Sequence, residues 1–318
     1  MSPLLARGRY APSPTGALHL GNLRTALLAW LFARRRDGAF VLRIEDLDRP
    51  RTRPGADEKL LDDLRWLGLD WDEGPRAAGA LGPYYQSQRE ALYLAALGRL
   101  YAKGLLYPCY CTRAEVAQLA SAPQVATDKG PRYPGTCRDL TPQQQRARAA
   151  SGRQPAWRFR APQAPITFAD LIAGSVTQSV DRTVGDFVVR RSDGVIAYQL
   201  AVVVDDALMG VTQVVRGMDL LASTARQLAL LDALGYPRPT EYAHVPLVVD
   251  QHGERLAKRE ASAGLDDLRR RGLSPGQVVG ALATSCGLWP AGVPASPSEV
   301  LATFEPERLT RTPSAVQL

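Results

Sequence analysis

The stretch GRYAPSPTGALHLGNLRTALLAW, from Gly8 to Trp30, combines residue types that can hold a phosphate. It predicts a short strand, a turn stiffened by prolines, and the start of an apolar helix. The first turn of a helix has unpaired backbone N–H groups and the positive end of the helix dipole, so it attracts anions. His19 could donate a hydrogen bond to a phosphate or simply cap the helix, and Gly21 allows close approach to the backbone.

A second candidate stretch, GERLAKRE at 253–260, follows an apolar strand near the other end of the chain. Its Lys258 stands between Arg255 and Arg259. A lysine on such a loop can neutralise charge on a triphosphate as it reacts. A solvated basic loop would have the same composition, so the stretch alone leaves both interpretations open.

Cysteines form a third candidate site. Cys109 and Cys111 make a Cys-x-Cys pair, and Cys137 follows 26 residues after Cys111. Structural zinc sites usually have four Cys or His ligands, and no histidine stands nearby. The spacing fits either a zinc site completed by another residue or three buried thiols. Cys286 is expected in the core, and four cysteines in a chain this long do not predict a disulfide framework.

Strands alternating with helices are predicted around the first stretch. A strand over 7–11 and another in AFVLRIED, 39–46, flank a helix with four leucines on one face, namely Leu20, Leu23, Leu27 and Leu31. Another helix follows and ends at Gly68. This order predicts a parallel sheet with crossover helices.

The middle of the chain breaks this alternation and is predicted to be an insertion, with part of 120–132 in a loop. Beyond it, VIAYQLAVVVDD, VTQVVRG and HVPLVV are predicted strands, with a helix over 220–234. The expected division has two halves of one α/β domain at 1–108 and 182–262. The insertion is 109–181, and a short helical segment with a flexible tail is 263–318.

Composition sets broader limits. The 318 residues suffice for one large domain or two ordinary ones. No apolar run is long enough to span a membrane and no signal pattern opens the chain, so a cytoplasmic protein without membrane contact is expected. A net charge of +7 and the arginine-rich segment 138–160 would suit a polyanionic partner, although a solvated surface explains those arginines as well.

Five motifs occur in order over about residues 7–262: RYAPSPTGALHLGNLRTALL, RIEDLD, VVVDD, VVRGMDLL and RLAKR. Together they resemble the class I aminoacyl-tRNA synthetases of the glutamate/glutamine group. HLGN is similar to the HIGH signature of that class, and RLAKR to its KMSKS signature, with Lys258 as the second lysine. Asn22, Arg255 and Ala257 depart from the usual His, Lys and Ser. These departures could slow activation and should not abolish it.

The resemblance implies a Rossmann-like parallel sheet with helices on both faces, interrupted by an inserted, zinc-containing acceptor-type subdomain. It implies that His19 and Lys258 are catalytic and contact ATP together with Gly21 and Asn22. The implied glutamate site consists of Arg9, Tyr10, Ala11, Pro12, Ser13, Glu45, Tyr198 and Arg216. Arg9 would bind the side-chain carboxylate and Glu45 the ammonium group. Without the family, Glu45 could be a surface charge and Tyr198 a packed strand aromatic.

Fifty-nine residues follow Arg259, fewer than a full glutamyl-tRNA synthetase has after its KMSKS-like loop. The chain thus resembles the truncated branch of the group, the glutamyl-Q tRNA(Asp) synthetases, which lack an anticodon-binding domain. In that branch a tyrosine completes the zinc ligands, which implies one structural Zn²⁺ on Cys109, Cys111, Tyr133 and Cys137.

The truncated branch also implies an activity. ATP, with its Mg²⁺, would activate L-glutamate without tRNA, and a monomeric enzyme would transfer the glutamate to the queuosine base in the anticodon of tRNA(Asp). Three alternatives stay open. They are a truncated glutamyl-tRNA synthetase that charges a tRNA 3′ end, a non-catalytic tRNA-binding relic, and a nucleotidyltransferase that shares the HIGH-type loop.

Overall fold

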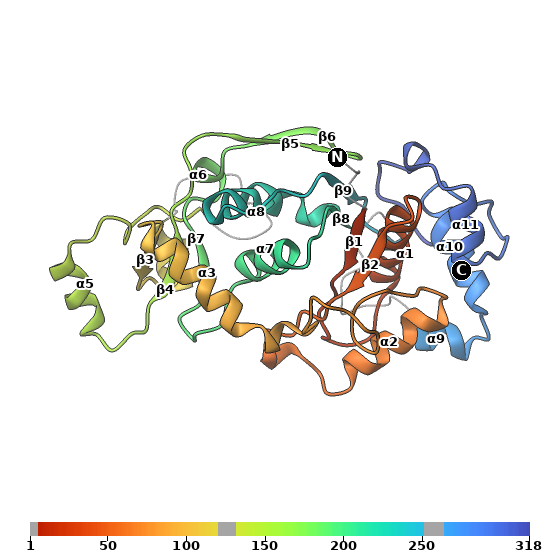
Figure 1. Cartoon of the computed structure of the whole chain (residues 1–318), viewed down its shortest axis with the longest axis horizontal. Helices are drawn as coiled ribbons and strands as arrows, with labels where there is room; N and C mark the ends of the chain where they lie inside the picture. The colour runs from red at the N-terminus through yellow and green to blue at the C-terminus, as the bar shows by residue number, and fades with distance from the viewer. Residues whose placement is uncertain (1–5, 120–131, 251–263) are drawn as a thin grey trace.

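The centre of the molecule is a four-stranded parallel sheet of order β2-β1-β8-β9 (Figure 1). The computed structural model describes residues 6–119, 132–250 and 264–318. The strands of this sheet are β1 (Arg7–Tyr10), β2 (Ala39–Leu42), β8 (Gln213–Gly217) and β9 (Glu241–Val245). β1 and β8 are parallel neighbours although most of the chain's other elements lie between them. The predicted parallel sheet is confirmed.

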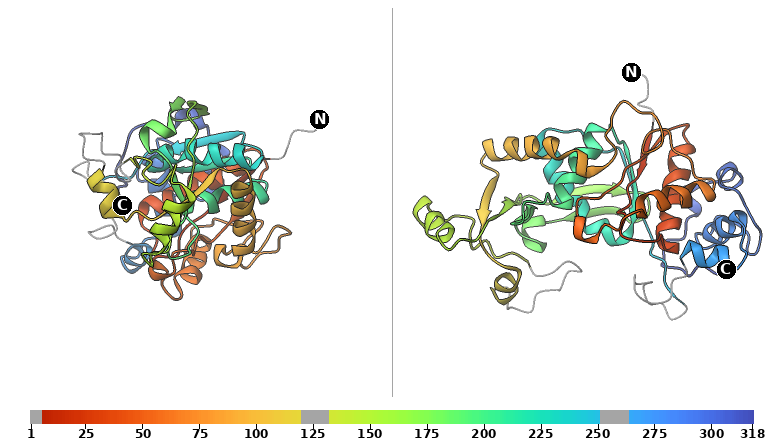
Figure 2. Two further views of the ribbon diagram at one scale, coloured as in Figure 1. Left: turned by 90° about the vertical axis from the view of Figure 1, so that its left-hand side faces the viewer. Right: turned by 90° about the horizontal axis from the view of Figure 1, so that it is seen from below.

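Helices cover both faces of this sheet. Neighbouring side chains on a strand point to opposite faces. Val214 accordingly packs into one hydrophobic core and Val215 into another. The first core is shared with α7 (Tyr198–Leu208) and α8 (Leu221–Leu234), and the second with α1 (Leu20–Arg34) and α10 (Pro275–Thr284). Figure 2 shows the two sets of helices on either side. The expected α/β class is therefore confirmed.

The middle of the chain forms antiparallel structure of its own. Its strands are β3 (Leu106–Cys109), β4 (Ala156–Phe159), β5 (Ile166–Asp170), β6 (Gly174–Gln178) and β7 (Phe187–Arg190), and its helices are α4 (Arg113–Leu119), α5 (Pro142–Ala149) and α6 (Val180–Thr183). Strands β3, β4 and β7 make one sheet, and β5 and β6 form a hairpin. The hairpin returns to the parallel sheet, because the Leu171 N–H donates to the Tyr242 carbonyl at 2.9 Å.

The prediction of a strand over VIAYQLAVVVDD is wrong, since most of this stretch is helix α7. Three consecutive valines favour a strand by propensity. In the folded chain all of Gln199 to Asp206 is buried, and a helix enclosed on all sides needs no polar face. Asp205 pairs with Arg89 and Asp206 with Arg43 in that interior, and these pairs offset the free-energy cost of burying the two carboxylates.

The remaining helices surround the parallel sheet and its two cores. They are α2 (Ala56–Trp66), α3 (Glu90–Ala102), α9 (Leu265–Arg270) and α11 (Pro297–Ala302). The segment after Pro290 differs from the expected flexible tail, because it contains α11 and buries Phe304 and Leu309 in the core of α1. Its composition is poor in large apolar residues, but Val300 is buried in the same core and Ser314 accepts from Arg24 at 2.7 Å. The four-part division of the chain stays a prediction. Within the described residues, no helix has both the length and the apolarity to cross a bilayer.

Candidate functional site

The residues predicted to bind glutamate and ATP line one cavity of about 690 Å³. It opens where the chain leaves β1 and β8, which is where ligands bind to open parallel sheets. The predicted residues on its wall are Arg9, Tyr10, Ala11, Pro12, Ser13, His19, Gly21, Asn22, Glu45, Tyr198 and Arg216. Sequence segments that are far apart thus meet at one place. Lys258 lies outside the described residues.

His19 is the N-cap of α1 and also part of the cavity wall. Its Nδ1 accepts the backbone N–H of Asn22 at 3.3 Å, and the Asn22 side chain accepts the His19 N–H at 3.4 Å. A neutral imidazole that accepts at Nδ1 carries its proton on Nε2, which makes Nε2–H a donor. Gly21 leaves room beside the ring, since a Cβ there would lie only 3.0 Å from His19 Cε1 and would press on it. His19 therefore both caps the helix and forms part of the cavity.

A chain of ion pairs through two further residues, Asp206 and Arg43, connects Arg9 with Glu45. Arg9 Nε lies 3.3 Å from the Asp206 carboxylate, and Asp206 accepts from Arg43 at 2.8 Å. Arg43 in turn lies 3.2 Å from Glu45. Burial raises the pKa of Glu45, an effect that Arg43 opposes. Burial also acts to raise the pKa of Asp206, but Arg9 and Arg43 outweigh it and hold that pKa low.

Sequence reasoning missed the two central members of this network, Arg43 and Asp206. Both stood inside quoted motifs. Arg43 is the first residue of RIEDLD, and Asp206 is the last residue of VVVDD. The sequence signal that could have indicated such a pair is a charged residue inside an apolar stretch, because such a residue is buried only when it has a partner of opposite charge. Arg43 is 0% exposed and also lies 3.6 Å from Asp205.

Cys109, Cys111 and Cys137 come together at the end of β3, with their sulfur atoms within 4.8 Å of one another. The Tyr133 hydroxyl oxygen lies 3.4 Å from Cys109 Sγ and accepts the Cys137 N–H at 2.8 Å. A hydrogen bond with Cys137 lowers the pKa of the Cys109 thiol against the opposing effect of burial, and Arg158 adds to the lowering. The Cys111 and Cys137 sulfurs are 3.6 Å apart, near the roughly 3.8 Å expected for two thiolates on tetrahedral zinc. The four side chains fit a metal ion.

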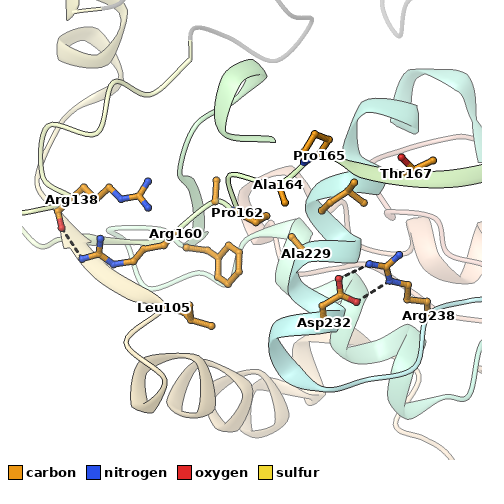
Figure 3. Close-up of a pocket in the computed structure, with 13 residues that line it drawn as sticks. Leu105, Arg138, Arg160, Pro162, Ala164, Pro165, Thr167, Ala229, Asp232 and Arg238 are labelled. Carbon is orange, nitrogen blue, oxygen red and sulfur yellow. Dashed lines mark hydrogen bonds and ion pairs between the residues drawn. The ribbon is translucent and has the colours of Figure 1, made fainter. Parts of the chain in front are cut away.

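A second cavity, of about 560 Å³, lies between the inserted region and α8 (Figure 3). Its charged residues are already paired. Arg238 is 2.6 Å from Asp232, while Arg160 donates to the carbonyl of Arg138 at 2.8 Å and lies 3.3 Å from Asp139. No predicted site residue lines this cavity. The first cavity is therefore the candidate active site.

Comparisons with known proteins show the family of this chain. A family model described as tRNA synthetases class I (E and Q), catalytic domain, matches residues 6–291. The chain is 57% identical over 306 residues to a glutamyl-Q tRNA(Asp) synthetase of Symbiobacterium thermophilum, covering 96% of this chain and 94% of the relative. A protein of the same name from Nitratidesulfovibrio vulgaris is 49% identical over 309 residues, covering 97% and 95%.

Longer relatives match over part of their length. Glutamate–tRNA ligase 2 of Syntrophus aciditrophicus is 45% identical over 283 residues, which are 89% of this chain and 58% of the relative. The crystal structure of glutamate–tRNA synthetase from Elizabethkingia anophelis has a TM-score of 0.85 at 29% identity, covering 99% of this chain and 68% of that one. The chain therefore belongs to the class I glutamyl- and glutaminyl-tRNA synthetases, a family of ligases, and within it to the glutamyl-Q tRNA(Asp) synthetases.

Proposed function

We propose that this enzyme activates L-glutamate with ATP in the absence of tRNA and then transfers the glutamate to queuosine in the anticodon of tRNA(Asp). The single observation that carries the proposal is the 57% identity to a glutamyl-Q tRNA(Asp) synthetase over 94% of that relative's length. The cavity supports it, because it gathers the residues that a glutamate and ATP site of this family requires. We propose a monomeric, cytoplasmic enzyme.

In the proposed site, glutamate is held by opposite charges at its two ends. The Glu45 carboxylate would bind the ammonium group, and Arg9 and Arg216 would bind carboxylates, because a guanidinium can grip a carboxylate with two hydrogen bonds. The Tyr198 ring and the backbone of Tyr10 to Ser13 would complete the wall. Arg9 already has Asp206 as a partner, so its charge is partly compensated.

Activation needs no side-chain nucleophile. The α-carboxylate of glutamate attacks the α-phosphorus of ATP, a P–O bond to pyrophosphate breaks, and glutamyl-adenylate forms. The protein's part is to align the two substrates and to stabilise the developing charge. The N-terminus of α1, with Gly21, Asn22 and the Nε2–H of His19, would face the phosphates. ATP brings its own Mg²⁺.

Lys258 is proposed to contact the ATP phosphates. Two described residues that flank its segment in the chain lie beside the cavity. Val248 lines the cavity, and a Cβ on Gly264 would lie 3.7 Å from that of Ala17, another residue of the wall. The segment that carries Lys258 is thus flanked at both ends by residues beside the candidate active site.

In the proposed second step a hydroxyl of the cyclopentene ring of queuosine attacks the activated carbonyl carbon. An ester bond forms, the acyl–phosphate bond breaks, AMP leaves, and the hydroxyl proton is released. We also propose that Cys109, Cys111, Tyr133 and Cys137 hold one structural Zn²⁺, which would fix the fold of the inserted region and take no part in the reaction.

The test is pyrophosphate exchange into ATP with glutamate and no tRNA, followed by transfer of labelled glutamate to tRNA(Asp) with and without queuosine. We expect exchange without tRNA and label only on the queuosine-containing tRNA. Exchange that requires a glutamate tRNA, with label at its 3′ end, would instead identify a short glutamyl-tRNA synthetase. Absence of exchange both without tRNA and with a glutamate tRNA would contradict the proposal and favour a non-catalytic tRNA-binding relic.

A further inference from the structure

Arg216 is held by three uncharged acceptors. Its Nε–H donates to His244 Nε2 at 3.0 Å, Nη1 donates to Gln227 Oε1 at 2.7 Å, and Nη2 donates to Thr224 Oγ1 at 2.9 Å. A guanidinium has five N–H groups, so these bonds leave one N–H on Nη1 and one on Nη2. Because none of the three acceptors is charged, the positive charge of Arg216 is available to an anion in the cavity that it lines.

The ring of His244 has a defined tautomer. The Arg216 Nε–H and the Thr224 hydroxyl, at 3.1 Å, converge on Nε2, which must therefore present its lone pair. On the other side of the ring, Nδ1 lies 2.6 Å from Asp170 Oδ2 and carries the proton. His244 is 0% exposed, and burial lowers its pKa to about 4 despite the hydrogen bond to Asp170, so the ring is neutral at pH 7.

The two oxygens of Asp170 share one partner and differ in the others. Oδ1 accepts the backbone N–H groups of Ile172 and Ala173 at 2.9 and 2.8 Å. Oδ2 lies 2.6 Å from His244 Nδ1, and the His244 backbone N–H donates to both oxygens, at 3.1 Å to Oδ2 and 3.3 Å to Oδ1. Asp170 is the last residue of β5, in the inserted hairpin. A continuous set of hydrogen bonds thus runs from the inserted hairpin through β9 to Arg216 on β8.

We propose that His244, fixed by Asp170, is a positioning residue that orients Arg216 toward a carboxylate of glutamate. His244 does not line the cavity and acts through the hydrogen bond that it accepts from Arg216. The inference rests on the proposed function, because glutamate is the ligand whose carboxylate Arg216 would bind. The arrangement matches the general way in which a carboxylate fixes the tautomer of a functional histidine.

Asp170→Asn tests the tautomer directly. The backbone N–H groups of Ile172 and Ala173 require an oxygen at the Oδ1 position, so the new amide nitrogen must take the place of Oδ2. It would then donate to His244 Nδ1 and move the ring proton to Nε2, where it opposes the Arg216 Nε–H. We expect the KM for glutamate in pyrophosphate exchange to rise about tenfold to hundredfold, the effect of one lost hydrogen bond to a charged group. The KM for ATP should not change.

Nitrogen-15 NMR of the imidazole rings gives a readout that does not depend on activity. The chain has three histidines, so the signals can be assigned by substitution. In the wild-type protein His244 should have a protonated Nδ1 and an unprotonated Nε2, and Asp170→Asn should reverse the two. An Nε2-protonated His244 in the wild-type protein would overturn the proposal.

Two variants of His244 separate positioning from packing. His244→Gln keeps an oxygen acceptor near the position of Nε2, whereas His244→Leu keeps similar volume without an acceptor. We expect the glutamate KM of His244→Gln to stay near the wild-type value and that of His244→Leu to rise further. Equal glutamate KM values in the two variants would mean that the ring only fills space.

Asp186→Asn is the matched control. Asp186 is also a buried aspartate near the inserted region, and it accepts from Tyr107, Arg138 and the backbone of Ala161, none of which lines the candidate active site. Its substitution should lower the melting temperature and leave the glutamate KM unchanged. If Asp170→Asn behaves in the same way, the proposed role of Asp170 and His244 is wrong. If the wild-type protein gives no exchange at all, the proposed function fails. The His244 tautomer measured by NMR and glutamate binding measured by calorimetry then still test the positioning role of His244.

Discussion

Among single residues, Glu45 offers the sharpest test of the amino-acid site. Its carboxylate must be ionised to bind an ammonium group, and burial raises its pKa from the ordinary value. As pH falls, Glu45 therefore protonates earlier than an exposed glutamate would, and the KM for glutamate should rise. Glu45→Gln should raise that KM about tenfold to hundredfold at neutral pH and remove this acidic dependence. Pyrophosphate exchange across the acid range measures both.

The control for Glu45 is Glu73→Gln. Glu73 pairs with Arg7 at 2.6 Å and accepts from Tyr84 at 2.7 Å, and it does not line the cavity. Its loss should affect stability and leave the pH dependence of the glutamate KM as in the wild type. An unchanged glutamate KM in Glu45→Gln would exclude Glu45 as the ammonium partner.

Part of the cavity wall could be predicted from motifs, whereas the residues that hold those side chains in place could not. Arg9, Glu45 and Arg216 lie in recognisable motifs. His244 was predicted only as part of a strand, because its role depends on Asp170, which is 74 residues earlier in the chain. A hydrogen bond between distant segments leaves no local pattern in a single sequence. The same holds for Arg43 and Asp206.

At the level of elements, the cysteine cluster predicts how the inserted region is stabilised. Protein purified without chelator should contain about one zinc per chain, because three thiolates and a phenolate oxygen complete a tetrahedral site. Cys109→Ser should reduce the zinc content well below one and lower the melting temperature, since metal binding is coupled to folding. Elemental analysis and thermal unfolding measure the two effects.

Cys286→Ser is the control for zinc. Cys286 is the remaining cysteine, and it is buried in the core beside α10. Its substitution should keep the metal even if it lowers stability. Wild-type protein that contains no zinc, or a Cys109→Ser variant that keeps its full zinc content, would show that the cluster is only a group of buried thiols.

The elements themselves were predicted unevenly, for physical reasons. α1 is largely enclosed, since Ala26 to Ala33 are all buried, and it was recognised because leucine and alanine dominate it and favour a helix. Three consecutive valines in α7 favour a strand instead. α7 is enclosed by the sheet, α3 and α8, and a fully buried helix has no polar face to reveal its period. The ordering of the C-terminal segment likewise depends on distant contacts, among them the Phe304 ring packed edge-on against Phe32 at 5.2 Å and the Ser314 hydroxyl that accepts from Arg24 at 2.7 Å.

Across the whole molecule, the two proposed steps should differ in their dependence on salt. The chain has a net charge of +7, and a tRNA partner would be bound largely through its phosphates. Each phosphate contact releases counterions, so two to four contacts should weaken tRNA binding about tenfold to hundredfold between ~50 and ~200 mM salt. In the proposed site, glutamate and ATP would lie in the cavity, where Arg9 and Arg216 are buried and their charges are less screened.

Steady-state measurements over this salt range separate the steps. The KM for tRNA in the transfer reaction should rise steeply, while glutamate-dependent pyrophosphate exchange without tRNA should change by less than about threefold, as expected for weakly screened charges. The salt is potassium chloride. Potassium glutamate is unsuitable because glutamate is the proposed substrate. A transfer reaction insensitive to salt would mean that basic side chains of this protein do not bind the tRNA backbone. Equal sensitivity of both reactions would mean that salt acts on the amino-acid site itself.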